Sequence, residues 1–141
     1  MSTTENIAVV ESFWDALGRR DFSGVGALMS AQGHYVDVPV MEVDEGAHGP
    51  AETEARVRLG LEPLQVYLLH PGPIVATGDI VITEHAETWT WDEDTSVRLP
   101  FVSVQEVRSG KVDRWWDYFD LQALMSAAPS WWVDHIAAGY K

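Results

Sequence analysis

The sequence predicts an α+β fold, because helical and strand patterns occupy different parts of the chain. Apolar residues recur at helical spacing as far as about residue 59, and runs rich in β-branched and aromatic residues follow from residue 63. Helices followed by a long antiparallel sheet are typical of this class. By analogy with other folds, we expect a cone-shaped barrel: a strongly curved, mostly antiparallel sheet closed by three N-terminal helices, with a short helical C-terminal tail.

Three helices are expected in the first part of the chain. A Ser-x-x-Glu capping box at residues 2–5 precedes the first helix, and Gly18 ends it. Asp21 can cap a second, shorter helix. The third begins at Pro50 and runs to about Leu59, with acidic residues in its first turn and arginines in its last, which suits the helix dipole.

Strands are expected from residue type and alternation, the earliest at residues 34–39. Those after residue 63 are expected at 64–70, 74–76, 80–91, 97–107 and 112–121. The tail beyond Leu121 carries apolar residues typical of short helices, interrupted at Pro129. No linker is long enough to split the chain, so residues 1–141 are expected to form a single domain.

Charge and composition exclude several functional classes. The chain has 22 acidic and 9 basic side chains and a formal net charge of −13. It should therefore repel phosphate backbones and anionic membranes, so nucleic-acid binding and membrane docking are not expected. The lack of cysteine excludes thiolate chemistry. Without a signal-peptide pattern or an apolar run approaching about 20 residues, a cytoplasmic protein is expected.

The last predicted strand places a carboxylate on an aromatic face. Alternation puts Trp115, Asp117 and Phe119 on one side of it. A carboxylate among apolar groups is costly to ionise, so its pKa tends upward, and Asp117 is a candidate general base. The alternative is a surface strand on which Asp117 faces water.

Two more strands place polar and aromatic residues on one face. On the central strand that face carries His85, Glu87, Trp89 and Trp91. The early strand carries Tyr35 and Asp37 in the same way. If these faces and Asp117 line one cavity, three carboxyl groups meet an imidazole and a phenol. They cannot all ionise, so at least one proton is shared or one pKa is raised, which separates an acid from a base.

Each of these residues also has a structural explanation. His85 could be a hydrogen-bonded core histidine, and Glu87 could be a cross-strand partner of Arg98 or Arg114. No metal is expected, because the five histidines lack ligand spacing. No cofactor is expected either, because phosphate loops and dinucleotide-binding turns are missing from the sequence.

Three segments resemble one enzyme family. Residues 115–121, Trp-Trp-Asp-Tyr-Phe-Asp-Leu, resemble the Trp-Arg-Asp-Tyr-Phe-Asp-Leu segment of limonene-1,2-epoxide hydrolases. Residues 81–87 are similar to that family's Val-x-Thr-Glu-Arg-x-Asp, and residues 35–39 to its Tyr-x-Asn-x-Pro. The family belongs to the nuclear-transport-factor-two-like (SnoaL-like) superfamily, so the resemblance implies the same cone-shaped fold.

The resemblance implies a one-step opening of an epoxide by water, without a covalent intermediate and without a cofactor. Asp117 corresponds to the carboxylate that takes a proton from water, and Glu87 to the acid that protonates the epoxide oxygen. His85 stands where the family has an arginine that bridges the two carboxyl groups. Tyr35 and Asp37 correspond to the tyrosine and asparagine that hold the water. The sequence departs from the family at positions 37, 85 and 87.

Hence the first hypothesis is an epoxide hydrolase or epoxide-opening enzyme for a small, mostly apolar substrate, with Trp89, Trp91, Trp115 and Phe119 as pocket walls. A second is an isomerase, dehydratase or polyketide-type cyclase that uses Tyr35, Asp37 and His85 for proton transfer. A third is a non-catalytic module that binds a hydrophobic ligand or dimerises. A homodimer is expected, because a sheet face with Trp116 and Tyr118 suits contact with a second copy, although a covering helix would serve equally well.

Overall fold

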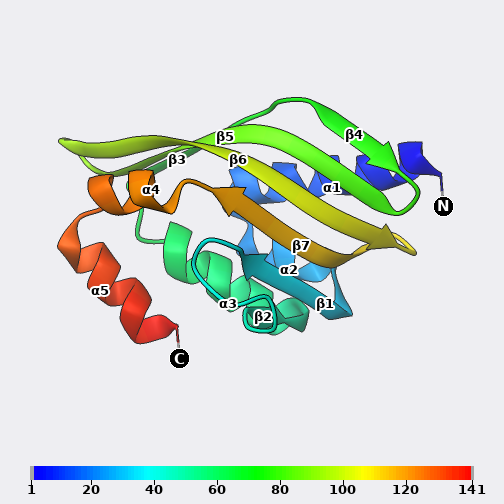
Figure 1. The fold of residues 1–141 in the computed structure, drawn as a ribbon, viewed down its shortest axis with the longest axis horizontal. Coiled ribbons are helices and arrows are strands. Elements are labelled where there is room, and N and C mark those ends of the chain that lie inside the picture. The colour runs from blue at the N-terminus through cyan, green and yellow to red at the C-terminus, as the bar shows by residue number, and fades with distance from the viewer. Residues whose placement is uncertain (1, 141) are drawn as a thin grey trace.

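The computed structural model describes residues 2–140, and its elements follow the predicted order (Figure 1). The helices are α1 (Thr3–Gly18), α2 (Phe22–Leu28), α3 (Gly49–Leu61), α4 (Leu121–Ala127) and α5 (Ser130–Gly139). The strands are β1 (Met29–Asp37), β2 (Ala47–His48), β3 (Val66–His70), β4 (Ile74–Thr77), β5 (Ile80–Asp92), β6 (Thr95–Arg108) and β7 (Lys111–Phe119). The prediction of an α+β cone is confirmed.

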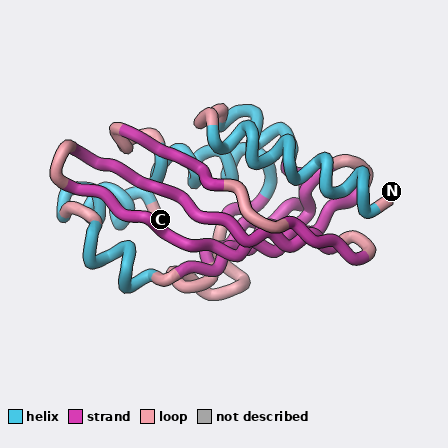
Figure 2. Tube along the Cα trace, turned by 90° about the horizontal axis from the view of Figure 1, so that it is seen from above, coloured by secondary structure: helices cyan, strands magenta, loops and turns pink. Residues whose placement is uncertain are grey.

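The strands form one curved, unclosed sheet in the order β2-β1-β7-β6-β5-β3, and β4 also pairs with β5. Long antiparallel strands β5, β6 and β7 make the predicted meander, whereas β1 runs parallel to β7. In Figure 2 the strands make one twisted layer, with the long N-terminal helix lying along it. The sheet is therefore mostly antiparallel, as the sequence predicted.

Local sequence signals explain where the first helices begin. The Ser2 hydroxyl accepts a hydrogen bond from the Glu5 amide at 3.1 Å, and the Asp21 carboxylate accepts one from the Gly24 amide at 3.0 Å. Each cap satisfies a backbone N–H that has no partner within its helix. No helix within residues 2–140 is both long and apolar enough to cross a membrane.

Several strand ends differ from the prediction by one or two residues, and two differences near the start of the sheet are larger. Strand β1 begins at Met29, five positions before the predicted residue 34, and Met29 pairs with Val112 of β7. The short strand β2 lies in the segment expected to be a loop, and Ala47 pairs with Tyr35. Both additions come from pairing with distant segments, so local propensity did not reveal them.

The inner face of the sheet carries the core and a row of polar side chains. From α1, Val10, Phe13 and Leu17 are buried, and the Phe13 ring meets the Trp115 ring edge-on at 4.6 Å. Backbone register places four polar residues side by side across β5, β6, β7 and β1. They are Thr83, Ser103, Asp117 and Asp37, and all are buried. Asp117 and Asp37, at one end of this row, line the candidate site described below.

Candidate active site

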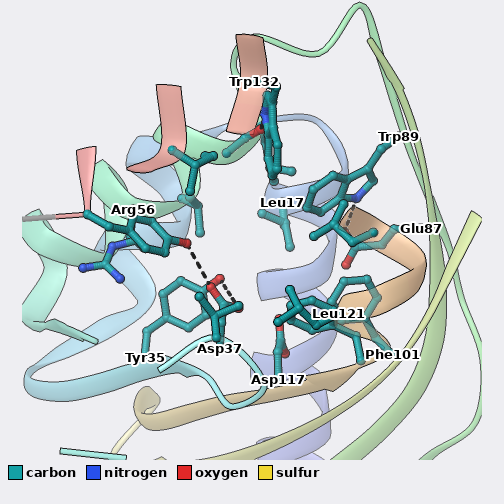
Figure 3. Close-up of a pocket in the computed structure, with 18 of the residues that line it drawn as sticks. Leu17, Tyr35, Asp37, Arg56, Glu87, Trp89, Phe101, Asp117, Leu121 and Trp132 are labelled. Atoms are coloured by element: carbon teal, nitrogen blue, oxygen red, sulfur yellow. Dashed lines mark hydrogen bonds between the residues drawn. The ribbon is translucent and has the colours of Figure 1, made fainter. Parts of the chain in front are cut away.

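A cavity of about 110 Å³ lies against the inner face of the sheet, at the end covered by the C-terminal helices (Figure 3). Its walls are largely apolar and include Leu17, Val57, Leu61, Phe101, Leu121, Leu124 and Trp132. Its polar lining is provided by Tyr35, Asp37, Arg56, Glu87, Asp117 and Tyr140. An apolar cavity of about 150 Å³ holds a benzene ring, so this space suits a compact molecule.

Asp117 lies on β7 at the bottom of the cavity and is 4% exposed. Its Oδ1 accepts hydrogen bonds from Ser103 Oγ at 2.5 Å and from the Trp115 indole Nε1 at 2.6 Å. Burial raises the pKa of Asp117 well above its usual range, and the neighbouring Asp37 carboxyl raises it further. The two donors act the other way, because they stabilise the charged form.

Glu87 lies on β5 across the same cavity and is 3% exposed. Its Oε1 accepts a hydrogen bond from the Trp89 indole Nε1 at 3.0 Å. Burial raises the pKa of Glu87 to about 7, against the opposing effect of the Trp89 donor. Near neutral pH a large fraction of this side chain is therefore protonated and can donate.

Asp37 forms a third acidic position with two phenols around it. Its Oδ1 accepts from the Tyr35 hydroxyl at 2.9 Å and its Oδ2 from the Tyr140 hydroxyl at 3.4 Å (Figure 3). Burial raises the pKa of Asp37 to about 6, while Tyr35, Arg56 and Tyr140 hold it down. Arg56 lies over the Tyr140 ring, 4.1 Å from its centre. Of the three carboxyl groups that line the cavity, Asp37 is the one whose pKa is held down by a cationic side chain, that of Arg56.

His85 lies beside the cavity and is not part of its lining. Its ring is enclosed by Trp14 at 4.6 Å and by Phe101 at 5.3 Å between ring centres, and Phe101 faces the cavity in its place. Its Nε2 lies 3.0 Å from Ser103 Oγ, and its Nδ1 lies 3.6 Å from Glu87 Oε2. The resemblance to a family with a bridging arginine at this position implies a charged group between two carboxylates, but burial lowers the pKa of His85 to about 4. The expected charged bridge is thus corrected to a neutral imidazole.

Of the four aromatic residues expected to line the pocket, three do so and one does not. Trp89, Trp115 and Phe119 line the cavity. Trp91 is not among its lining residues, because it packs behind the others, with its ring 6.2 Å from Trp89 and 5.6 Å from Trp132. Tyr35 and Asp37 both line the cavity, as their shared face predicted.

Three functional candidates were missed by the sequence analysis: Arg56, Ser103 and Tyr140. Alternation along β6 could have placed Ser103 on the inner face, since it shares that face with the buried Phe101 and Gln105. Arg56 and Tyr140 come from α3 and from the residue after α5, and no local pattern indicates that they meet. Within residues 2–140, no three acidic or histidine side chains are grouped so that they could hold a metal ion.

Comparisons with known proteins agree with the fold. The family model described as the limonene-1,2-epoxide hydrolase catalytic domain matches residues 4–130. A solved LEH-like epoxide hydrolase from M. tuberculosis is 26% identical, with 96% of this chain and 95% of that chain covered and a TM-score of 0.74. A search of curated proteins finds no match.

Other solved structures share the fold at lower identity. A protein with a ketosteroid isomerase-like fold from Catenulispora acidiphila is 17% identical over 84% of this chain and 90% of that chain, with a TM-score of 0.75. A proposed SnoaL-like polyketide cyclase from Jannaschia is 20% identical over 90% of this chain and 94% of that chain, with a TM-score of 0.77. At these identities the likeness concerns the fold alone.

Proposed function

The chain belongs to the limonene-1,2-epoxide hydrolase family, and we propose that it opens a small, mostly apolar epoxide by one-step addition of water. The observation that carries this proposal is that two buried carboxyl groups, on Asp117 and Glu87, line one otherwise largely apolar cavity. In such surroundings neighbouring carboxyl groups take different protonation states, as an acid and a base must. The reaction forms no covalent intermediate with the protein.

Asp117 acts as the general base. The donors on Ser103 and Trp115 occupy Oδ1, and Oδ2 has no hydrogen-bond partner within residues 2–140, so it can accept a proton from water. A raised pKa makes the ionised carboxylate a stronger proton acceptor. As the water oxygen bonds to an epoxide carbon, its proton passes to Asp117.

Glu87 acts as the general acid. As the carbon–oxygen bond of the epoxide breaks, Glu87 donates its proton to the leaving oxygen, and the product is a diol. A pKa of about 7 suits this role, because the proton is present near neutral pH and is still readily given up. Water is oriented by the Tyr35–Asp37 pair, whose oxygens lie next to Asp117 through the β1–β7 pairing.

The apolar lining of the cavity and the negative net charge of the protein indicate the class of substrate. Aromatic and aliphatic side chains dominate the cavity, and its polar groups are gathered around three carboxyl groups. An anionic substrate would be repelled by these groups and by the net charge of −13. A compact, neutral epoxide bound through apolar contact fits both features.

The test is to incubate the protein with a panel of small apolar epoxides in water enriched in heavy oxygen and to analyse products by mass spectrometry. We expect a diol carrying one heavy oxygen, and loss of that product in the Asp117→Asn variant. A ring-opened product of unchanged mass, without label, would indicate that the reaction is isomerisation or cyclisation and not hydrolysis. Unaltered hydrolysis by Asp117→Asn would remove the base assignment.

A second candidate, an isomerase, dehydratase or polyketide-type cyclase, is favoured by one observation. Asp37 carries a titratable group between two phenols at a position where the resembled family has asparagine. If Asp37 transfers the proton, Asp37→Asn should abolish turnover. If epoxide hydrolysis is the reaction, Asp37→Asn should be tolerated far better than Asp117→Asn, because an amide at position 37 can still hold water.

A homodimer through the outer face of the sheet is also proposed. Exposed apolar side chains lie there on three neighbouring strands, with Ile82 36%, Val102 38% and Tyr118 40% exposed. Val102 and Tyr118 are direct partners in the β6–β7 register. Burying these side chains against a second copy would remove apolar surface from water.

A further inference from the structure

Two carboxyl groups lie side by side where the attacking water is proposed to bind. Asp37 and Asp117 are direct partners in the pairing of β1 with β7, and both are buried and line the cavity. A water molecule between them can hydrogen-bond to both and give its proton to either. The proposed hydrolysis assigns the proton to Asp117, so the surroundings of the two groups must make Asp37 the weaker base.

The two carboxyl groups differ in the hydrogen bonds they accept. On Asp117 both donors reach Oδ1, and Oδ2 has no hydrogen-bond partner within residues 2–140. On Asp37 each oxygen already accepts from a phenol, Oδ1 from Tyr35 at 2.9 Å and Oδ2 from Tyr140 at 3.4 Å. Burial raises the pKa of both phenols, so they stay protonated and donate. Such donors stabilise the charged form of a carboxyl group and weaken it as a base.

Positive charge is also placed on the Asp37 side of the cavity. The Arg56 Cζ atom lies 4.1 Å from the centre of the Tyr140 ring, within the range of a cation–π contact. Burial raises the pKa of Asp37 to about 6, and the phenols and the Arg56 charge keep it from rising further. On Asp117, burial and the charges of Asp37 and Glu87 all raise the pKa. A charged Asp37 therefore also strengthens Asp117 as a proton acceptor.

Helix α5 sets the position of Tyr140, the residue that follows it. The Trp132 Nε1 atom of this helix donates to the Gly60 carbonyl at 3.0 Å. That carbonyl belongs to the last turn of α3, where helix carbonyls have no partner in their own helix. Arg56 lies one turn earlier on α3. The packing of α5 on α3 thus brings the phenol and the guanidinium together beside Asp37.

Resting on the function proposed above, we infer that Tyr140 and Arg56 are positioning residues that make Asp117, and not Asp37, the base. They act through Asp37, whose carboxylate they hold as an acceptor that orients the attacking water without taking its proton. The water then gives that proton to the free Oδ2 of Asp117. Asparagine, which the family has at position 37, needs no such restraint because an amide does not take up a proton. Tyr140 lies outside residues 4–130, which the family model matches, so family membership assigns it no role.

The kinetic test is a double-mutant cycle between positions 37 and 140. Tyr140→Phe removes one hydroxyl and keeps the ring that packs on Arg56. Its kcat for epoxide hydrolysis should fall about three- to tenfold, the range for one lost hydrogen bond. In the Asp37→Asn background the same change should alter kcat by less than about twofold, because the competing carboxyl group is gone. Equal losses in the two backgrounds would overturn the proposed role, since a structural contribution of the hydroxyl does not depend on the charge at position 37.

A carbon-13 NMR titration of the Asp37 carboxyl carbon tests the same contacts without substrate. Its pKa should be about 6 in the wild type. It should rise in Tyr140→Phe and in Arg56→Gln, because a lost donor or a lost positive charge destabilises the ionised form. The groups around Asp37 that stay unchanged in both variants are Tyr35 on β1, Asp117 on β7 and Glu87 on β5.

Two variants serve as matched controls for this titration. Tyr118→Phe removes a phenol hydroxyl from an exposed side chain that does not line the cavity. Arg58→Gln removes a positive charge from α3 that is paired with Glu54 and Glu62. Both should leave the pKa of Asp37 unchanged. In Tyr140→Phe and Arg56→Gln, an unchanged pKa would overturn the role, and so would a fall toward about 4, which indicates entry of water.

Failure of the proposed function is separately visible. If wild-type protein converts no epoxide in the panel to a labelled diol, the hydrolase assignment fails and the choice of base fails with it. If wild type produces the diol but Tyr140→Phe leaves either kcat or the pKa of Asp37 unchanged, only the role of Tyr140 and Arg56 fails, because both effects follow from the same contact.

Discussion

Replacing Glu87 by glutamine should make the protein more stable at neutral and alkaline pH while removing its activity. Glu87 is 3% exposed, and its carboxyl group is forced to ionise in apolar surroundings. Glutamine is almost the same size, its oxygen can still accept from Trp89 Nε1, and it cannot ionise. The variant therefore removes the cost of a buried charge and keeps the packing.

The magnitude follows from the pKa of the group. Burial raises the pKa of Glu87 from 4.5 to about 7. Each pKa unit corresponds to about 1.4 kcal/mol, so the free energy of unfolding falls by about 3 kcal/mol as pH rises through this range. The sign is set by proton binding: between pH 4.5 and about 7 the unfolded chain holds fewer protons on this group than the folded protein. Below pH 4.5 the cost disappears.

The assay is urea unfolding of both proteins at several pH values, with Glu93→Gln as the control because Glu93 is exposed at the β5–β6 turn. The stability gain of Glu87→Gln over wild type should grow from near zero at acid pH to about 3 kcal/mol above neutral pH, whereas Glu93→Gln should show little pH dependence. A Glu87→Gln gain that stays constant, or a loss that grows with pH, would refute the reasoning.

Three other perturbations test separate parts of the account. Asp117→Asn should lower kcat for epoxide hydrolysis by about 10²–10⁴-fold with an unchanged circular dichroism spectrum; full activity would contradict its role as base. Trp132→Ala should lower the free energy of unfolding by about 3–5 kcal/mol, since Trp132 is 4% exposed and packs on Trp89 and Trp91; a loss below about 1 kcal/mol would contradict that burial. Val102→Asp should shift a dimer to monomer in light scattering, and an unaffected dimer would exclude this face.

The sequence predicted the inner face of the sheet well, because strand alternation is a strict two-residue period. It placed Tyr35, Asp37, Glu87 and Asp117 on faces that meet, and all of them line the cavity. However, alternation shows only which face of the sheet a side chain lies on, and not whether the side chain reaches the cavity. His85 and Trp91 have the same parity as Glu87, yet neighbouring aromatic rings separate both from the cavity.

Residues from helices were harder to predict than those from strands. Arg56 meets Tyr140 and Asp37 only because α3 and the end of α5 pack over the open end of the sheet. The contacts of Tyr140 with Arg56 and Asp37 depend on tertiary packing between segments more than 80 residues apart in sequence. The lowered pKa of His85 was missed for a related reason, since burial by Trp14 and Phe101 is a tertiary effect.

The most direct test of the central claim is a carbon-13 NMR titration of the side-chain carboxyl carbons of Asp117 and Glu87. We expect Glu87 to titrate with a pKa of about 7. Asp117 should titrate above its usual range but lose its proton before Glu87, because the Ser103 and Trp115 donors stabilise its charged form. If instead both carboxyl groups titrate near 4, as solvated acids do, the cavity does not divide them into proton donor and proton acceptor, and the proposed mechanism is contradicted.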